Sequence, residues 1–309
     1  MATPQLEPGI VVAGHGRHVW VETPDGRRLI CHPRGKKSQT VVGDQVLWQA
    51  TEDEGTIEKV LPRRNLFYRQ DEIRTKSFAA NLDQVLILIA AEPEFSESQL
   101  CRALIAAEAE KIRPIIALNK SDLTEPFGRA WERMGAYREM GYQVVPLALK
   151  PKADGINATE LDALMPLMQD KTTLVLGPSG SGKSTLINRL IPNARVLTNE
   201  ISTALNSGKH TTTSTNLYWV DAARTTAVID SPGFQEFGLN HIDPMHLVSL
   251  MPDIKAHAQE CKFYNCSHLH EPGCGVISKV KEGPGPHGIG AHRYKIYSDL
   301  FAELSQTRY

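Results

Sequence analysis

Nine consecutive residues near the middle of the chain have the types and spacing needed to hold phosphate groups. They read Gly-Pro-Ser-Gly-Ser-Gly-Lys-Ser-Thr, with two glycines separated by four residues and followed by Lys183 and Ser184. Glycines let the backbone turn its N–H groups inward, and the start of a following helix adds partial positive charge. Lys183 is expected to reach the β- and γ-phosphates, and the Ser184 hydroxyl to bind Mg²⁺. The predicted nucleotide contacts are Gly177, Pro178, Ser179, Gly180, Ser181, Gly182, Lys183, Ser184 and Thr185.

A second stretch, Asn119-Lys120-Ser121-Asp122, follows an expected strand and indicates which base is bound. Guanine presents N1–H and an exocyclic NH₂ side by side, and one carboxylate can accept both hydrogen bonds. Asp122 is therefore expected to select guanine, while Asn119 and Lys120 orient the loop and cover the ring. This tetrapeptide is weak evidence alone, but together with the phosphate loop it predicts a GTP site that includes Ser121.

Two further stretches fit the magnesium and γ-phosphate end of such a site. Asp230-Ser-Pro-Gly233 ends a strand, where Asp230 can hold Mg²⁺ through water and the Gly233 N–H can sense the γ-phosphate. The segment Gly208–Thr213 lies between the phosphate loop and this strand, where a mobile switch with a magnesium-sensing threonine is expected. Among its threonines we favour Thr212 for that role.

A cluster of cysteine and histidine near the C-terminal end has the spacing of a metal site. Cys261-x₄-Cys266-x-His268-x₅-Cys274 supplies three thiolates and one imidazole, a closed tetrahedral set typical of one structural zinc ion. His270 is an alternative ligand. The basic residues around it are candidates for RNA contact: Lys262, Lys279, Lys281, Arg293 and Lys295. Cys31 and Cys101 stand alone and are expected to be buried apolar residues.

The elements that must position these residues fall into two patterns. Residues 9–61 contain five short runs rich in β-branched residues and separated by turns, which predicts a small barrel of the OB type. Residues 62–76 carry several arginines and are interpreted as a basic linker. In the barrel, the cluster Arg34–Lys37 is either a phosphate contact or a solvated loop.

From residue 77 onward, strands and helices alternate, which predicts a doubly wound parallel sheet with helices on both faces. Strands are expected at 84–91, 114–118, 143–148, 172–177, 215–220 and 226–229, and helices at 97–112, 128–140, 158–168 and 184–191. After residue 240 this pattern gives way to the cysteine- and histidine-rich segment and a last helix near 294–305.

The order of the motifs is unusual, because the Asn-Lys-x-Asp stretch precedes the phosphate loop instead of following it. A bound nucleotide depends only on spatial arrangement, so a chain with relocated ends can build the same site. The chain resembles the circularly permuted GTPases. The barrel, the Ala80–Gln84 approach to the first strand of the sheet, the Gly208–Thr213 switch and the Cys/His segment make it similar to the ribosome small subunit-dependent GTPases of the RsgA (YjeQ/YloQ) family over essentially its whole length.

This resemblance implies a bacterial GTPase of the cytoplasm that binds the small ribosomal subunit and its rRNA, acts late in subunit maturation and is stimulated by the subunit. It favours His268 over His270 as the zinc ligand. It also implies a last guanine contact from the backbone of Ala148, although the serine usual in that loop is missing from Pro146–Lys150. Phe234 stands where other GTPases orient water with glutamine, so His210 becomes the candidate catalytic residue, the alternative being an RNA contact.

The composition fits this interpretation. The 309 residues are 41% hydrophobic and 22% charged, with a formal net charge of −1, so a soluble multidomain protein is expected, a monomer without membrane contact. We predict an OB-fold domain at 1–66, a circularly permuted P-loop GTPase domain of α/β class at 67–239, and a mainly α zinc-binding domain at 240–309. Its ligands are GTP or GDP with Mg²⁺, and its partners the small subunit and further assembly factors. The rival interpretation is a non-catalytic, GTP-dependent RNA-binding module.

Overall fold

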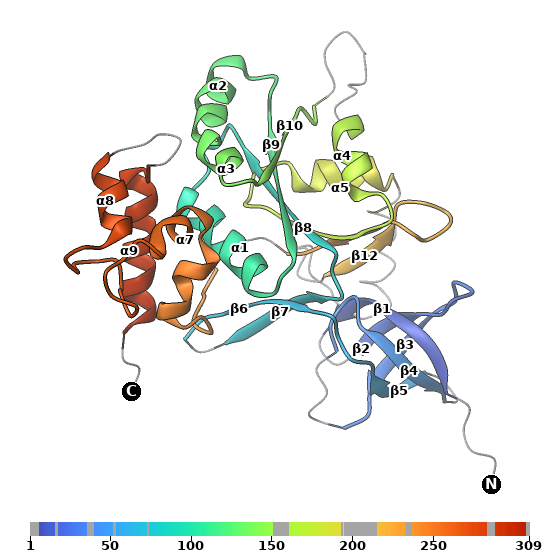
Figure 1. Ribbon diagram of the computed structural model, residues 1–309. Helices are drawn as coiled ribbons and strands as arrows, with labels where there is room; N and C mark the ends of the chain where they lie inside the picture. Colours follow the sequence, from blue (N-terminus) through green and yellow to red (C-terminus); the bar gives the residue numbers. More distant parts are fainter. Residues whose placement is uncertain are drawn as a thin grey trace.

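The computed structural model describes residues 6–15, 18–35, 40–51, 54–72, 74–150, 161–192, 194, 215–232, 237–282 and 288–306. They form a β-barrel, a central sheet flanked by helices, and a group of C-terminal helices packed beside that sheet (Figure 1). No helix in the described part of the chain is long and apolar enough to cross a bilayer.

The N-terminal barrel has five strands: β1 (Glu7–His15), β2 (His18–Glu22), β3 (Arg28–Pro33), β4 (Gln45–Ala50) and β5 (Gly55–Val60). They pair in the order β1-β2-β3-β5-β4, and β4 pairs back onto β1, which closes the barrel. Its interior is a separate cluster of buried side chains, among them Val11, Val21, Cys31 and Trp48. The predicted barrel is confirmed, and so is the burial of Cys31.

The interpretation of residues 62–76 as a linker is wrong. Strands β6 (Leu66–Gln70) and β7 (Thr75–Ala80) form an antiparallel hairpin there. Phe67 and Phe78 face inward and pack against Phe237, with ring centroids 5.6–5.9 Å apart. In a strand, side chains that face inward alternate with side chains that face outward. The nearby arginines made this alternation hard to recognise in the sequence, so a linker was predicted.

The central sheet contains five parallel strands in the order β10-β9-β8-β11-β13. They are β8 (Gln84–Ala90), β9 (Arg113–Asn119), β10 (Gln143–Leu147), β11 (Thr172–Leu176) and β13 (Ala227–Asp230). Strand β12 (Asn216–Trp219) runs antiparallel to β13, so the expectation of a wholly parallel sheet holds for five strands only. Strand β12 also pairs with β1, through Ala13 and Asn216, and so joins the barrel to the sheet.

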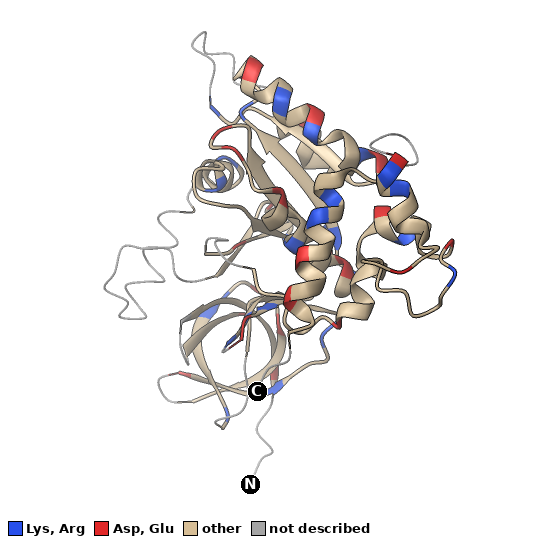
Figure 2. Cartoon of the chain, turned by 90° about the vertical axis from the view of Figure 1, so that its left-hand side faces the viewer, with Lys and Arg blue, Asp and Glu red and all other residues tan. Residues whose placement is uncertain are grey.

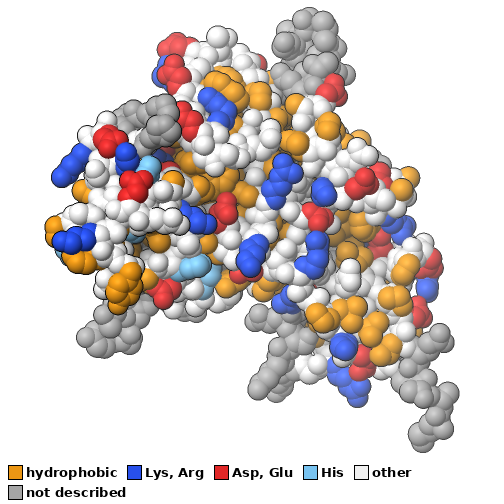
Figure 3. Space-filling view, viewed as in Figure 1, with side chains coloured by type: hydrophobic (Ala, Val, Ile, Leu, Met, Phe, Trp, Pro, Cys, Tyr) orange, Lys and Arg blue, Asp and Glu red, His pale blue; other side chains and the backbone are white. Residues whose placement is uncertain are grey.

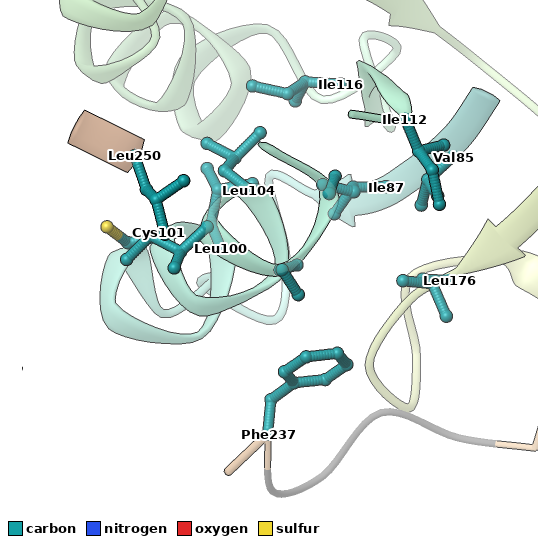
Figure 4. Close-up of a cluster of buried hydrophobic side chains, with 14 of the residues drawn as sticks. Val85, Ile87, Leu100, Cys101, Leu104, Ile112, Ile116, Leu176, Phe237 and Leu250 are labelled. Atoms are coloured by element: carbon teal, nitrogen blue, oxygen red, sulfur yellow. The ribbon is translucent and has the colours of Figure 1, made fainter. Parts of the chain in front are cut away.

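Helices cover both faces of this sheet, as expected (Figure 1). Alternate residues of β8 point to opposite faces of the sheet. Ile87 belongs to the buried cluster that includes α1, and Leu88 belongs to the cluster that includes α4 and α5. Figure 4 shows Val85 and Ile87 turned toward Leu100 and Leu104 of α1. The predicted helix at 128–140 is divided at Met134 into α2 and α3. The bounds are α1 (Glu97–Ala109), α2 (Thr124–Arg133), α3 (Gly135–Glu139), α4 (Leu161–Met168) and α5 (Lys183–Leu190).

The C-terminal segment is mainly helical, as predicted. It contains η1 (Pro244–Leu250), α7 (Pro252–Ala258), α8 (Gly275–Glu282) and α9 (Ala291–Leu304). Acidic and basic side chains are interspersed along the helices seen in Figure 2, rather than segregated by sign. Leu250, Ile254 and Leu300 belong to the same buried cluster as Leu100 of α1, so these helices share a core with the central sheet.

Candidate nucleotide site and candidate metal centre

The predicted phosphate loop lies between β11 and the start of α5, as its motif requires. Gly180 and Gly182 have φ angles of 80° and 100°, a region that side chains rarely adopt. A Cβ at Gly182 would lie 2.3 Å from the Asn119 Nδ2, and one at Gly177 would lie 2.6 Å from the Leu88 carbonyl oxygen. Glycine is therefore required both for the turn and for the close approach of neighbouring loops.

Asn119, at the end of β9, joins the 119–122 loop to the phosphate loop. Its side chain is 3% exposed, and its Nδ2 donates to the Ser181 carbonyl at 2.8 Å. Its Oδ1 accepts from the backbone N–H of Leu149 at 3.1 Å and of Lys120 at 2.7 Å. One buried amide thus fixes three loops relative to one another, although the loops are far apart in the sequence.

The loop after β8 completes this corner, and sequence analysis missed it. Lys120 has a φ of 71°, and its ammonium group donates to the Glu92 carbonyl. Pro93 packs against the phosphate loop, since a Cβ at Gly180 would lie 3.2 Å from its Cδ. No motif marks residues 92 and 93 in the sequence, because Glu92 takes part through its backbone carbonyl, whatever its side chain.

These loops surround a pocket of about 480 Å³, within the range of small-molecule sites. Most of the predicted nucleotide contacts line it, but Ser121, Ala148 and Ser181 do not. Ala148 is buried, and its neighbours Leu149 and Lys150 line the pocket instead. Lys150 is the last residue of the Pro146–Lys150 stretch, so this motif could have indicated its place in the pocket. The lining residues are Asn119, Lys120, Asp122, Leu149, Lys150, Gly177, Pro178, Ser179, Gly180, Gly182, Lys183, Ser184 and Thr185.

Asp230 lies beside Lys183, one of the residues that line this pocket. Strands β11 and β13 are adjacent and parallel, and the Asp230 carboxylate accepts from the Lys183 ammonium at 2.5 Å. Both side chains are largely buried, at 13% and 14% exposed. The Asp230 carboxylate is thus held beside Lys183, which directly precedes Ser184 in the chain. His210, Thr212 and Gly233 lie outside the described residues, as does Phe234.

The Cys/His cluster assembles as its spacing predicted, with ligand atoms of Cys261, Cys266, His268 and Cys274 all within 4.8 Å of one another. Sγ of Cys261 lies 3.8 Å from Sγ of Cys274, and the two sulfurs lie 3.4 and 3.5 Å from the Nδ1 of His268. In tetrahedral zinc sites, sulfur pairs lie about 3.8 Å apart and sulfur–nitrogen pairs about 3.5 Å apart. The cluster could therefore hold a metal such as zinc, whereas His270 is outside it and exposed.

Neighbouring groups hold the ligands in place. The backbone N–H groups of Gly275 and Ile277 donate to Sγ of Cys261 and Cys274 at 3.3 and 3.4 Å. The Tyr294 hydroxyl donates to the His268 carbonyl at 2.8 Å. Burial, the largest cause, raises the pKa of the Cys266 thiol to about 12, so metal binding at neutral pH must displace its proton.

One predicted RNA contact is wrong. Arg293 is 6% exposed, and its guanidinium donates to both carboxylate oxygens of Asp253, at 2.8 and 2.9 Å. It also contacts Cys101 and the ring of Tyr137 in the central region. The sequence could not show this, because an arginine that closes a buried ion pair looks the same there as an exposed one.

The barrel, the sheet and the order of the two nucleotide loops define a circularly permuted P-loop GTPase. Residues 60–240, more than half of the chain, match the family described as RsgA GTPase. A relative from Variovorax paradoxus (strain S110), named Small ribosomal subunit biogenesis GTPase RsgA, is 71% identical over 304 residues, which cover 98% of this chain and 94% of that one. A relative of the same name from Paraburkholderia xenovorans (strain LB400) is 48% identical, covering 96% and 93%.

Solved structures agree. YjeQ from Thermotoga maritima gives a TM-score of 0.73 at 29% identity, covering 98% of this chain and 100% of that one. YloQ, described as a circularly permuted GTPase, gives 0.70 at 28% identity, covering 99% and 98%. The chain therefore belongs to the RsgA GTPase family and is a GTP hydrolase. This confirms the resemblance seen in the sequence and favours the enzyme over the non-catalytic RNA-binding module.

Proposed function

We propose that this GTPase binds the small ribosomal subunit and its rRNA, assists late maturation of the subunit, and hydrolyses GTP to GDP and phosphate at a rate that the subunit stimulates. The observation that carries the proposal is the junction at Asn119, which joins the base-binding and phosphate loops in one pocket. We propose the small ribosomal subunit as the partner because the names of the relatives refer to its biogenesis. The proposed setting is the cytoplasm, the proposed state a monomer, and other assembly factors are further candidate partners.

We assign the base to the Asn119–Asp122 side of the pocket. Asp122 is exposed and lines the pocket, so its carboxylate is available to accept from guanine N1–H and NH₂. The aliphatic part of Lys120 covers the ring, since its ammonium is held by the Glu92 carbonyl. The backbone of the 148–150 loop, fixed by Asn119, supplies the contact to the guanine oxygen.

We assign the phosphates to the backbone N–H groups of residues 177–185 and to Lys183. When bound with GTP, Mg²⁺ would supply positive charge that neutralises the phosphate oxygens. The Ser184 hydroxyl, Asp230 through water, and Thr212 are the residues proposed to hold it. Asp230 pairs with Lys183 in this structure. The group proposed to hold Mg²⁺ and the group proposed to bind phosphate therefore already lie side by side.

His210 is proposed to orient the attacking water, and the Gly233 N–H to sense the γ-phosphate. Both proposals rest on the sequence. His210 is the candidate because the phenyl ring at position 234 can neither accept a proton nor align water. If His210 acts on water, His210→Ala lowers subunit-stimulated turnover with little change in GTP affinity. An equal loss of subunit affinity would instead identify an RNA contact.

One zinc ion is proposed at Cys261, Cys266, His268 and Cys274, where it holds the segment between α7 and α8. Four protein ligands leave no position for water, so its role is structural. We also retain the division into an RNA-binding barrel (1–66), a GTPase domain (67–239) and a zinc-binding domain (240–309) as a proposal.

The test is phosphate release from GTP, with and without purified small subunits, for the wild type, Ser184→Ala and a matched control, Ser298→Ala. Ser298 lies on α9 and does not line the pocket, so loss of its hydroxyl should leave turnover near wild type. Ser184→Ala should lose magnesium-dependent turnover in both conditions while keeping its fold. Absence of stimulation of the wild type by the subunit would remove the ribosomal part of the proposal, and full activity of Ser184→Ala would remove the magnesium assignment.

A further inference from the structure

The segment between Cys261 and Cys266 displays an aromatic side chain to solvent. Tyr264 is 102% exposed and its neighbour Phe263 is 41% exposed. Only two other large hydrophobic side chains in the described part of the chain are comparably exposed, Leu6 and Met245. Figure 3 shows hydrophobic and basic side chains together at the left-hand edge of the molecule, over the segment between α7 and α8. The ring of Tyr264 is therefore not covered by the described part of the chain and is accessible to a partner.

The backbone that carries Tyr264 is held at both ends. Cys261 and Cys266 belong to the candidate metal cluster on either side of it. The Lys262 N–H donates to the Gly273 carbonyl at 3.0 Å, and the Cys261 N–H donates to the Ala258 carbonyl at 3.3 Å. A ring presented by a fixed backbone loses little conformational entropy when a partner covers it.

Charge around this ring favours an anionic partner. The nearby acids are already engaged: Glu260 pairs with His257, Glu282 pairs with Lys279, and Glu271 accepts from the N–H groups of residues 267, 269 and 270. Lys262 has no acidic partner within the described residues, and its ammonium lies 5.6 Å from the Phe263 ring centroid. Tyr264 therefore lies two residues from a lysine that has no acidic partner among the described residues.

We propose that Tyr264 is a stacking platform for an unpaired base of RNA, with Lys262 on the adjoining phosphate. Every base has a π-face, so an exposed aromatic ring beside a cation suits single-stranded RNA, whereas duplex RNA keeps its bases stacked inside. The proposal rests on the proposed function, because it names how this end of the chain recognises the RNA of its partner.

The experiment uses the full chain loaded with zinc, and two probes: purified small subunits, and a 12-nucleotide RNA of mixed sequence, single-stranded or annealed to its complement. Tyr264→Ala should bind the single strand roughly 5- to 100-fold more weakly than the wild type, the range expected for loss of one stacked base. Tyr264→Trp should retain the affinity, because a larger ring stacks at least as well. Met245→Ala, which truncates another exposed hydrophobic side chain in the same region, should bind as the wild type does.

Zinc content and GTP hydrolysis without subunits should be unchanged in all variants, since neither Tyr264 nor Met245 lines the pocket or joins the Cys/His cluster. Wild-type affinity of Tyr264→Ala for the single strand overturns the proposal, and so does an equal loss with Trp, or an equal loss on duplex RNA. A loss confined to subunits, with single-strand binding intact, would assign the ring to a ribosomal protein and also overturn it. Tyr264-dependent binding of the single strand without any binding of subunits would refute the proposed function and leave the stacking site standing.

Discussion

The barrel and the C-terminal helices join the central region in different ways. The interior of the barrel is a buried cluster of its own, and of the described residues in this part of the chain only Val12 and Val42 belong to the cluster that includes α1. The C-terminal helices contribute many more side chains to that cluster, among them Leu247, Leu250, Ile254 and Leu300. Displacement of the barrel would therefore expose less apolar surface than displacement of the C-terminal helices.

The junction with the barrel combines backbone pairing, a few apolar side chains and buried polar groups. β1 pairs with β12, Val42 pairs with Ala79, and Glu22 of β2 is a buried carboxylate. The Trp219 Nε1 donates to it at 2.6 Å, and the Arg28 guanidinium at 2.6 Å. Arg224, in the turn between β12 and β13, lies 3.6 Å from it. Directional bonds of this kind fix an orientation without a large apolar contact.

The junction with the C-terminal helices is apolar and is closed by buried charges. Arg293 of α9 reaches Asp253 within its own region and Cys101 of α1 across the junction. Arg102 of α1 donates to Glu303 of α9 at 3.0 Å and to the Phe237 carbonyl at 3.2 Å. The chain is therefore asymmetric about its nucleotide site. One end is built into the GTPase core, and the other is attached to β12, the strand that follows the predicted switch.

Loss of the metal should give the largest effect on stability. Because the C-terminal helices share a core with α1, Cys266→Ala should destabilise the central region as well as its own segment, by more than about 5 kcal/mol. The measurement is guanidinium unfolding followed by GTP binding, with Cys31→Ala as the control for a buried thiol confined to the barrel. If Cys266→Ala left the unfolding of the GTP-binding region unchanged, the shared core would not act as one cooperative unit.

Arg293→Met should come next, at about 3–5 kcal/mol, because it leaves the Asp253 carboxylate largely buried without its partner. Urea unfolding of Arg293→Met, Asp253→Leu and the double variant separates the charge from the packing. The double variant should recover much of the loss, since no buried charge is then left alone. Additive losses would show that the pair does not act as a pair.

Glu22→Gln should cost less, about 1–2 kcal/mol, since the amide still accepts from Trp219 but no longer balances Arg28 and Arg224. The effect should be confined to the barrel, and hydrogen exchange in β8 and α1 should stay as in the wild type. The control is Glu7→Gln, whose exposed pair with Arg27 should show no measurable change. Faster exchange throughout the central sheet would mean that the barrel is as firmly integrated as the C-terminal helices.

The smallest expected effect is on partner binding. If the barrel end responds to the switch, a non-hydrolysable GTP analogue should give several-fold tighter co-sedimentation with small subunits than GDP does. Glu22→Gln should reduce that difference, because it loosens the attachment of the barrel to β12. Equal co-sedimentation of the wild type in both nucleotide states would show that the switch does not reach the RNA-binding ends.

The sequence predicted what depends on local spacing. The phosphate loop, the Asn119–Asp122 loop and the four metal ligands were recognisable because each needs fixed residue types a few positions apart. The hairpin at 66–80 was missed because its arginines hid the alternation of Phe67 and Phe78. The burial of Arg293, the part played by Glu92 and the shared core depend on segments far apart in the chain, and no local pattern records such contacts.

The central claim is that two loops in reversed order form one guanine nucleotide site. The most direct test is equilibrium binding of GTP, ATP and xanthosine triphosphate to the wild type and to Asp122→Asn. The wild type should bind GTP and reject ATP. Asp122→Asn should lose GTP affinity markedly and gain affinity for the xanthine nucleotide, whose C2 carbonyl can accept from the amide. Unchanged GTP affinity in Asp122→Asn, with no gain for xanthine, would contradict the assignment of the base to this loop.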